Sequence, residues 1–335
     1  MRADVFPYRL PLKRPWVAAA ATLAERRGAL LRLTADDGLT GWGDCAPLPS
    51  GGNADAVLAA LDEYCRRPAG ADFSALPPEV RWAIETARLD LDAQRQGVPL
   101  ARLLAPGAPL DIAINAALGP LDAGSGARAV AALEQGHAIG KLKVGLAGID
   151  AELARLRALV DATRGRLRLR LDANRAWPHD DAARFLAALG DLPIDGVEEP
   201  LAAPTLAGLA ALQAASPFPL AADESLPALG VEALIATRAV RRLVLKPARL
   251  GGHAATRAIA RQAQAAGIEV VLTSVIDSAI GVAAAAHLAA ALSPQLAHGL
   301  GTGAWLAADI APPLPVRAGR IALPDLPGLG LRPGQ

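Results

Sequence analysis

The sequence predicts an α/β protein, a (β/α) TIM-like barrel accompanied by an α+β capping domain. Three observations carry this prediction. Residues 109–311 alternate short apolar segments with alanine-rich amphipathic helices, and charged residues recur at the ends of the apolar segments. Residues 1–108 do not show this alternation. Strands that alternate with helices pair in parallel, and a barrel built this way carries its functional site at the carboxyl ends of its strands.

Composition limits the classes of partner. The chain has 335 residues, of which 52% are hydrophobic, and a formal net charge of +1. This balance gives no strong positive field for nucleic acid, so we expect small-molecule partners. A barrel takes about 250 residues, which leaves room for one smaller domain. The two cysteines, Cys45 and Cys65, have no metal-ligand spacing.

The N-terminus argues against export. The apolar stretch after Lys13 and Arg14 is short and alanine-rich, and it leads into a predicted strand, unlike a secretory signal. No apolar run reaches the roughly 18 residues that a membrane helix needs. We therefore expect a cytoplasmic protein with no membrane partner.

The predicted capping domain combines three antiparallel strands with two helices. Gly38 supplies the positive φ of a hairpin turn between the second and third strands, and Asn53 is a suitable cap for the first helix. The second helix begins with prolines, which a first helical turn tolerates. The strands are predicted at residues 2–10, 29–34 and 39–46, and the helices at 53–67 and 77–104.

The predicted barrel has eight parallel strands, separated by amphipathic helices such as 149–160 and 252–266. Eight strands in this alternation indicate a closed barrel. The tail, residues 312–335, is rich in proline and glycine, and we expect it to pack back on the capping domain. The strands are predicted at residues 111–117, 138–145, 167–174, 196–200, 220–225, 242–247, 269–274 and 297–303.

Charged side chains mark the ends of five of these strands. Asp172, Glu198 and Asp223 end three successive strands. Lys141 and Lys143 stand on the strand before them, and Lys246 ends the strand after them. A single charge of this kind is usually a solvated loop residue, but the shared position of all of them converges on one end of the barrel. The pattern therefore predicts a metal site with a lysine base on each side.

The residue types favour magnesium chemistry on a carboxylate substrate. An all-oxygen ligand set suits Mg²⁺, for which Mn²⁺ should substitute, and the absence of His and Cys argues against zinc. Such a site can support loss of a proton from the carbon beside a substrate carboxylate. We expect Lys143 to act as the base, tuned by Lys141, with Lys246 acting from across the barrel. Strand parity alone leaves Glu198 and Glu199 as alternative ligands.

The ordered motifs resemble those of the enolase superfamily, specifically its muconate-lactonizing-enzyme-like branch, whose barrel is a modified one. The motifs are Lys-Leu-Lys at 141–143, Asp-Ala-Asn at 172–174, Glu-Glu-Pro at 198–200, Asp-Glu-Ser at 223–225 and Leu-Lys-Pro at 245–247. The resemblance implies that Asp172, Glu198 and Asp223 hold the metal, with Asn174 beside it. It further implies that Thr273, Ser274 and Gly299 contact substrate.

Within that branch, the segments at residues 27–33, 41–49 and 170–177 are most similar to the o-succinylbenzoate synthases. That resemblance implies a lyase of menaquinone biosynthesis, which dehydrates 2-succinyl-6-hydroxy-2,4-cyclohexadiene-1-carboxylate through an ene-diolate. It also implies that residues 16–25 form a mobile loop over the substrate. Asp277 departs from the Glu that is common at its position.

Two alternatives stay open. An N-acylamino acid racemase or dipeptide epimerase of the same superfamily would use Lys143 and Lys246 on opposite faces of the substrate. Residues 299–303, Gly-Leu-Gly-Thr-Gly, lack the paired Asp motif of dipeptide epimerases in this branch. A non-catalytic binding barrel would require a broken set of acid and base residues, and here the set is intact.

Overall fold

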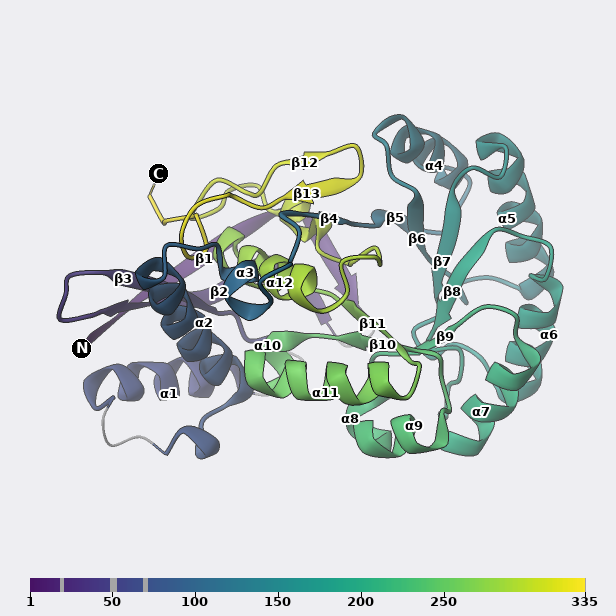
Figure 1. Cartoon of the computed structure of the whole chain (residues 1–335). Coiled ribbons are helices and arrows are strands. Elements are labelled where there is room, and N and C mark those ends of the chain that lie inside the picture. The colour runs from purple at the N-terminus through teal and green to yellow at the C-terminus, as the bar shows by residue number, and fades with distance from the viewer. Residues whose placement is uncertain (19–20, 49–52, 69–71, 335) are drawn as a thin grey trace.

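The structure, a computed structural model, describes residues 1–18, 21–48, 53–68 and 72–334. Within these residues it contains a three-stranded antiparallel sheet, a seven-stranded parallel sheet and a second small antiparallel sheet. Figure 1 shows the first antiparallel sheet with its helices beside the curved parallel sheet. The architecture is therefore a modified TIM-type barrel with an α+β cap, as the sequence predicts.

The cap sheet has the strand order β1-β2-β3. The helix α2 packs so closely on β3 that the two backbones are in contact. A Cβ added to Gly43 would lie 1.9 Å from the carbonyl oxygen of Ala83, so only glycine permits this approach. Asn53 caps α1 by accepting hydrogen bonds from the backbone of residues 55 and 56. The elements are β1 (Arg2–Ala18), β2 (Ala21–Thr34), β3 (Thr40–Cys45), α1 (Ala54–Arg66), η2 (Phe73–Ala75), α2 (Pro78–Arg95) and α3 (Leu100–Leu104).

Two predictions for the cap are wrong. The helix expected at 77–104 is two helices, because Gly97 takes a φ of 67° after α2 and Pro99 cannot continue the helix. The first two strands run past their predicted ends, so that residues 16–18 pair with residues 21–23 as a hairpin where we expected a loop. Residues 19–20 of that segment lie outside the described part of the chain.

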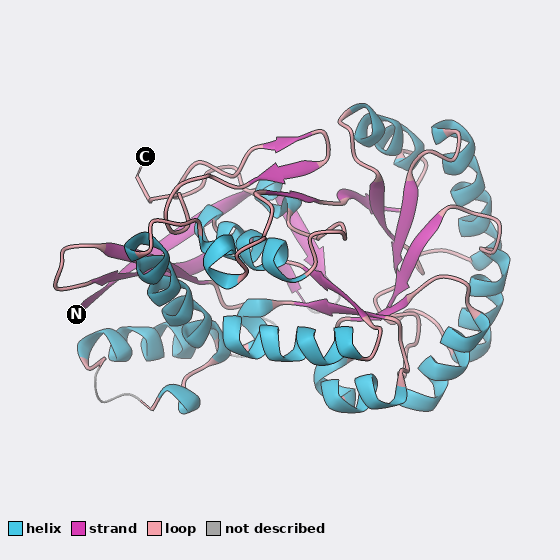
Figure 2. Ribbon diagram, in the orientation of Figure 1, coloured by secondary structure: helices cyan, strands magenta, loops and turns pink. Residues whose placement is uncertain are grey.

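The parallel sheet has the strand order β11-β10-β9-β8-β7-β6-β5, and helices cover its outer side (Figure 2). Its strands are β5 (Ala116–Pro120), β6 (Ile139–Lys143), β7 (Arg168–Asp172), β8 (Ile194–Glu198), β9 (Leu220–Ala222), β10 (Arg242–Leu245) and β11 (Glu269–Leu272). The helices between them are α4 (Ser125–Glu134), α5 (Ile149–Thr163), α6 (His179–Ala188), α7 (Leu206–Ala215), α8 (Leu226–Leu229), α9 (Val231–Thr237), α10 (Pro247–Leu250) and α11 (His253–Ala265).

The barrel closes differently from the prediction. The strand expected at 297–303 is absent from the described structure, which instead has single parallel bridges from His298 to Ile114 and from Gly299 to Thr273. These bridges touch both edges of the seven-stranded sheet. The short helix η3 (Gly301–Trp305) then follows. The glycines of this segment disfavour an extended strand, which accounts for the difference.

The strand predicted at 111–117 is also divided. Its first part, β4 (Asp111–Ala113), pairs with β13 (Arg320–Ala322), which pairs in turn with β12 (Val316–Arg317). The tail continues to α2, where the backbone NH of Leu329 donates to Asp90 at 2.8 Å. The domain boundaries at residues 108 and 312 stay a prediction.

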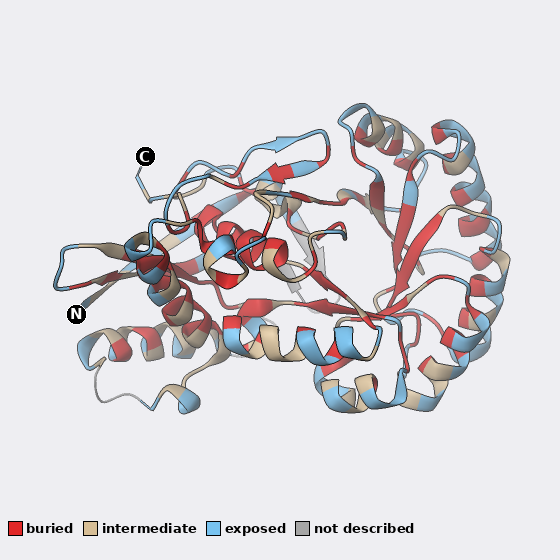
Figure 3. Ribbon diagram, in the orientation of Figure 1, coloured by how far each residue is buried: buried red, intermediate tan, exposed pale blue. Residues whose placement is uncertain are grey.

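The apolar core fills the space between the sheet and its helices. Figure 3 shows that the parallel strands and α12 (Ala279–Leu292) are largely buried. Cys45 and Cys65 are free thiols. In the described part of the chain, no helix is long and apolar enough to span a membrane.

Candidate active site

The predicted lysines and carboxylates lie at or near the carboxyl ends of neighbouring strands. The sheet register places Lys143 beside Asp172 and Asp172 beside Glu198 on neighbouring strands. Lys141 lies one inward-facing position lower, beside Arg170. The alternation of a strand therefore brings both lysines to the same face as the carboxylates.

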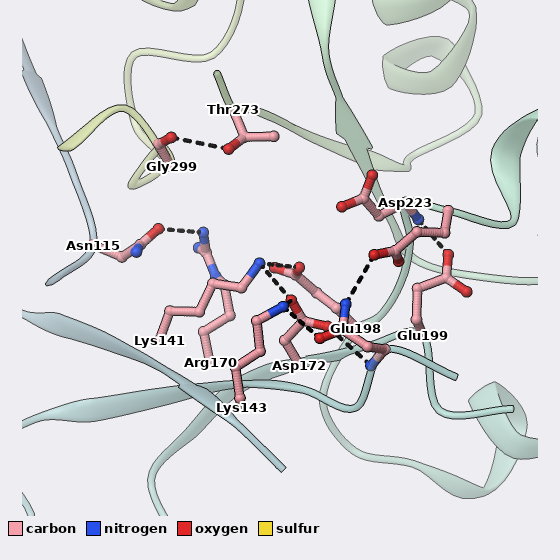
Figure 4. A network of polar contacts seen from close by, with 12 residues as sticks. Asn115, Lys141, Lys143, Arg170, Asp172, Glu198, Glu199, Asp223, Thr273 and Gly299 are labelled. Atoms are coloured by element: carbon pink, nitrogen blue, oxygen red, sulfur yellow. Dashed lines mark hydrogen bonds and ion pairs between the residues drawn. The ribbon is translucent and has the colours of Figure 1, made fainter. Parts of the chain in front are cut away.

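These groups form ion pairs, which Figure 4 shows in part. Lys141 Nζ lies 3.0 Å from Asp172 Oδ2 and also contacts Glu198 Oε2. Lys143 Nζ lies 2.8 Å from Asp172 Oδ2. On the other flank, Lys246 Nζ lies 2.5 Å from Asp223 Oδ1. We call these residues the lysine–carboxylate cluster; its members are Lys141, Lys143, Asp172, Glu198, Asp223 and Lys246.

The cluster shifts the pKa values of its members. Burial raises the pKa of Asp172, but Lys141 and Lys143 outweigh burial and hold it well below its usual range. Burial likewise lowers the pKa of Lys141 and of Lys246, but the facing carboxylates outweigh it and raise both. The facing carboxylates therefore favour the charged form of both lysines. That Lys141 tunes Lys143 as a base stays a prediction.

The structure separates the two adjacent glutamates. Glu198 turns toward Lys141, whereas Glu199 turns toward the loop after β9, as the close-up shows (Figure 4). Glu199 Oε1 accepts hydrogen bonds from the backbone NH groups of Asp223 and Ser225. Only Glu198 of this pair faces the lysines.

Asn174 and Glu224 extend the cluster. Asn174 Oδ1 accepts a hydrogen bond from Lys143, and its Nδ2 donates to Glu224 Oε1 at 2.8 Å. Burial, followed by the charges of Asp223 and Asp172, raises the pKa of Glu224 to about 7. Glu224 was not among the predicted site residues, although its place directly after Asp223 was a signal for it.

The predicted substrate contacts lie on the opposite wall. Thr273 Oγ1 donates to the carbonyl of Gly299 at 2.9 Å, and both stand apart from the carboxylates (Figure 4). Ser274 Oγ lies 2.5 Å from Thr302 Oγ1, a residue the sequence analysis did not single out. Asn174, by contrast, joins the lysine–carboxylate cluster directly.

The donor set fits a hard divalent cation. Lys141 Nζ contacts one oxygen of Asp172 and one oxygen of Glu198, so both carboxylates can reach a single cation. Asp223 ends the next strand along the sheet. Among the described residues, no three His, Cys, Asp or Glu side chains are grouped closely enough to hold a metal ion, and the lysines pair with these carboxylates.

Buried ion pairs around Asp195 lie beside the cluster, toward the amino ends of the strands. Asp195 Oδ2 accepts from the buried Arg170 at 2.9 Å and from the buried Arg242 at 2.7 Å. The register of β7 and β8 shifts at Asp195. A Cβ on Gly196 would lie 2.7 Å from Arg242 Nη1, so glycine leaves room for the guanidinium. Burial raises the pKa of Asp195, but both arginines outweigh it and lower the pKa.

A second group of buried charges lies where the cap meets the barrel. Asp44 of β3 accepts from Tyr8 at 2.7 Å and from the hydroxyl of Ser278, the cap residue of α12, at 2.8 Å. Asp277 is buried beside it, and its Oδ1 has no hydrogen-bond partner in the described structure. Arg26 donates its hydrogen bonds to the carbonyls of residues 46, 47 and 276. We call Tyr8, Arg26, Asp44, Asp277 and Ser278 the junction cluster.

Two hollows of about 350 Å³ lie away from the lysine–carboxylate cluster. One lies between the cap strands and the tail, with Trp42 and Pro333 among its lining residues, and the other lies beside Trp177. Neither is lined by a lysine or a carboxylate. We therefore assign the site by its charged groups and not by the hollows.

Comparison with known proteins supports this assignment of the fold. A family model described as Enolase C-terminal domain-like matches residues 125–334, more than half of the chain. The L-Ala-D/L-Glu epimerase of Bacillus subtilis (strain 168) is 28% identical over 99% of this chain and 96% of its own length. The o-succinylbenzoate synthase of Mycobacterium leprae (strain TN) is 43% identical over 150 residues, 44% of this chain and 43% of that enzyme.

A solved structure extends the likeness to almost the whole chain. The dipeptide epimerase of Enterococcus faecalis V583, complexed with Mg and the dipeptide L-Leu-L-Tyr, superposes with a TM-score of 0.88 at 27% identity. The superposition covers 98% of each chain.

Proposed function

Since the chain belongs to the enolase superfamily, in its muconate-lactonizing-enzyme-like branch, we propose that it removes a proton from the carbon beside a substrate carboxylate. The observation that carries this proposal is the strand order. The strands of Asp172, Glu198 and Asp223 lie between the strand that bears Lys143 and the strand that ends before Lys246. A substrate held over the carboxylates would thus have an amine on either flank.

Asp172, Glu198 and Asp223 would hold Mg²⁺, which would offset their negative charge and polarise the carboxylate of the substrate. Mn²⁺, another hard cation that accepts oxygen ligands, should substitute. The neighbouring epimerase structure contains Mg, which supports this choice of ion.

Lys143 would take the proton as general base. Its side chain is 36% exposed, which leaves the amine open to a substrate, and Asn174 and Asp172 orient it. Lys246 would place an ammonium group near the electron-rich ene-diolate and stabilise it.

The specific reaction that we propose is the dehydration of 2-succinyl-6-hydroxy-2,4-cyclohexadiene-1-carboxylate to o-succinylbenzoate, a step of menaquinone biosynthesis. In this reaction Lys143 takes the proton and returns it to the departing hydroxyl on the same face. The similarity to an o-succinylbenzoate synthase supports the choice. So does the sequence Gly-Leu-Gly-Thr-Gly at 299–303, which offers no carboxylate to a substrate ammonium.

A racemase or epimerase is the second candidate, because Lys143 and Lys246 are both present on opposite flanks of the carboxylates. That reaction would use one lysine to remove the proton and the other to return it. The similarity to an L-Ala-D/L-Glu epimerase over nearly the whole chain supports this alternative.

One experiment separates the two candidates. The protein is incubated in D₂O with the hydroxycyclohexadiene, and separately with N-succinylamino acids and dipeptides of both configurations. A dehydratase forms o-succinylbenzoate and leaves the amino acids unexchanged. Exchange of the α-proton in both configurations without dehydration would replace the first candidate by the second, and no reaction with any of them would contradict both.

A further inference from the structure

Glu199 lies beside a proposed metal ligand in sequence but has a different environment. It is 1% exposed, and its backbone takes a φ of 46°, which is strained for a residue with a side chain. Its carbonyl accepts from the NH of Arg175 at 2.7 Å, and its NH donates to the carbonyl of Ala221 at 3.0 Å. The residue thus links the chain that follows β7 to the end of β9.

The side chain of Glu199 makes three hydrogen bonds with one short loop. Its Oε1 accepts from the NH of Asp223 at 2.5 Å, the NH of Ser225 at 2.9 Å and the hydroxyl of Ser225 at 2.7 Å. All three donors would lose their partner if the carboxylate were removed. The loop would then be free to move at Asp223.

We infer that Glu199 is a positioning residue, which fixes the backbone of Asp223 and through it the place of Lys246. This inference rests on the proposed function, because it assigns Asp223 to the metal. Asp223 contacts Lys246 directly, whereas Glu199 contacts neither Lys143 nor Asp172 by any hydrogen bond in the described structure. The effect of Glu199 should therefore fall on the β9–β10 flank of the cluster.

Glu152 provides a matched control. It is also fully buried, and its carboxylate accepts from the backbone NH groups of residues 145, 146 and 147, in the loop after β6. None of these residues is a proposed ligand. If Glu199 only stabilised the fold, its removal and the removal of Glu152 should affect Mn²⁺ binding to the same degree.

The first test is direct titration of the protein with Mn²⁺, with free Mn²⁺ measured by electron paramagnetic resonance. Glu199→Ala should weaken Mn²⁺ binding about 10- to 100-fold, as loss of a group that orients a ligand does. Glu199→Gln keeps an oxygen acceptor and should stay within about 3-fold of wild type, since the hydrogen bonds and not the charge hold the loop. Glu152→Ala should bind Mn²⁺ as wild type does, even where its stability falls.

Equal losses in Glu199→Ala and Glu152→Ala would overturn the inference, and so would a Glu199→Gln variant as weak as Glu199→Ala. Should Glu199→Ala fail to fold, Ser225→Ala removes one of the three donors and should weaken Mn²⁺ binding to a smaller degree. Wild-type protein that binds no Mn²⁺ would contradict the proposed metal site itself.

The second test needs no metal. Lysine acylation, followed by mass spectrometry, gives the labelling rates of Lys246 and Lys143 in the same sample. Glu199→Ala should raise the rate at Lys246 several-fold relative to Lys143, because Asp223 no longer holds Lys246 in place. An unchanged ratio would overturn the inference whatever the outcome with Mn²⁺.

Discussion

Asp172 of the lysine–carboxylate cluster and Asp277 of the junction cluster are both buried, and their surroundings shift their pKa values in opposite directions. In the lysine–carboxylate cluster, the ammonium groups outweigh burial and lower the pKa of Asp172. In the junction cluster, burial and then the charge of Asp44 raise the pKa of Asp277 to about 7. Arg26 lies nearby, but its nitrogens donate to backbone carbonyls. The difference follows from where the cations direct their hydrogen bonds.

The partners of a buried charge indicate its role. Lysines that pair with carboxylates at an accessible strand end can exchange those partners for a metal and a substrate. The carboxyl of Asp277, buried with one oxygen unpartnered, should instead make folding stability depend on pH. The predictions below test this division, beginning with the largest effect.

Removal of divalent cations should abolish turnover, because carboxylates without Mg²⁺ repel an anionic substrate and stabilise no ene-diolate. The measurement is the dehydration rate of protein stripped with a chelator, before and after addition of Mg²⁺ or Mn²⁺. Either ion should restore activity. Full activity in the stripped protein would show that the lysine–carboxylate cluster is no metal site.

Loss of Lys143 should have the next largest effect. Lys143→Ala removes the proposed base and should lower kcat by about 10²–10⁴-fold, the usual contribution of general base catalysis. Lys246→Ala should lower kcat about 10²–10³-fold through lost electrostatic stabilisation. Each variant also leaves a buried carboxylate, Asp172 or Asp223, with one ammonium partner fewer, so kcat should be compared only for protein that urea unfolding shows to be folded. A Lys143→Ala variant with normal kcat would remove Lys143 from the mechanism.

The sequence predicted most of the fold and the cluster because their signals are local. Apolar segments in alternation with amphipathic helices define the parallel sheet, and charges at the ends of five predicted strands mark one end of the barrel. The sequence could not define the closure of the barrel. That closure depends on single bridges from His298 to Ile114 and from Gly299 to Thr273, which lie next to the edge strands, and no local pattern encodes them.

Strand alternation also could not predict which of Glu198 and Glu199 faces the lysines. Alternation along a strand says that the two point apart but not which one faces inward. The register of β7 and β8 also shifts at Asp195, so the facing of Glu198 cannot be counted from the start of its strand. The junction cluster was equally hidden, because Asp44 and Asp277 lie far apart in the chain.

Asp195 offers a third case, a carboxylate paired with cations in a fully buried layer. Asp195→Ala leaves Arg170 and Arg242 without their shared counter-charge and should lower the free energy of unfolding by about 3–5 kcal/mol. Asp180→Ala, at an exposed position in α6, should change it by no more than about 0.5 kcal/mol. Equal stabilities in urea would mean that the buried arginines find other partners.

The junction cluster should change how stability depends on pH. An Asp in an unfolded chain has a pKa of about 3.9, whereas the folded pKa of Asp277 is raised to about 7. Between these values the unfolded chain loses the proton and the folded protein keeps it. The free energy of unfolding should therefore fall as pH rises from about 4 to about 7, and level off above that range.

Asp277→Asn removes this titration, so the fall in stability across the same range should become shallower. The groups that face Asp277, namely Asp44, Arg26 and Glu79, remain and should leave a residual slope. Urea unfolding at intervals from pH 4 to pH 8 measures the difference, with Asp180→Asn as the exposed control. If the slopes of wild type and Asp277→Asn coincide, Asp277 is ionised in the folded protein at low pH, and the two clusters do not differ in the way that the comparison requires.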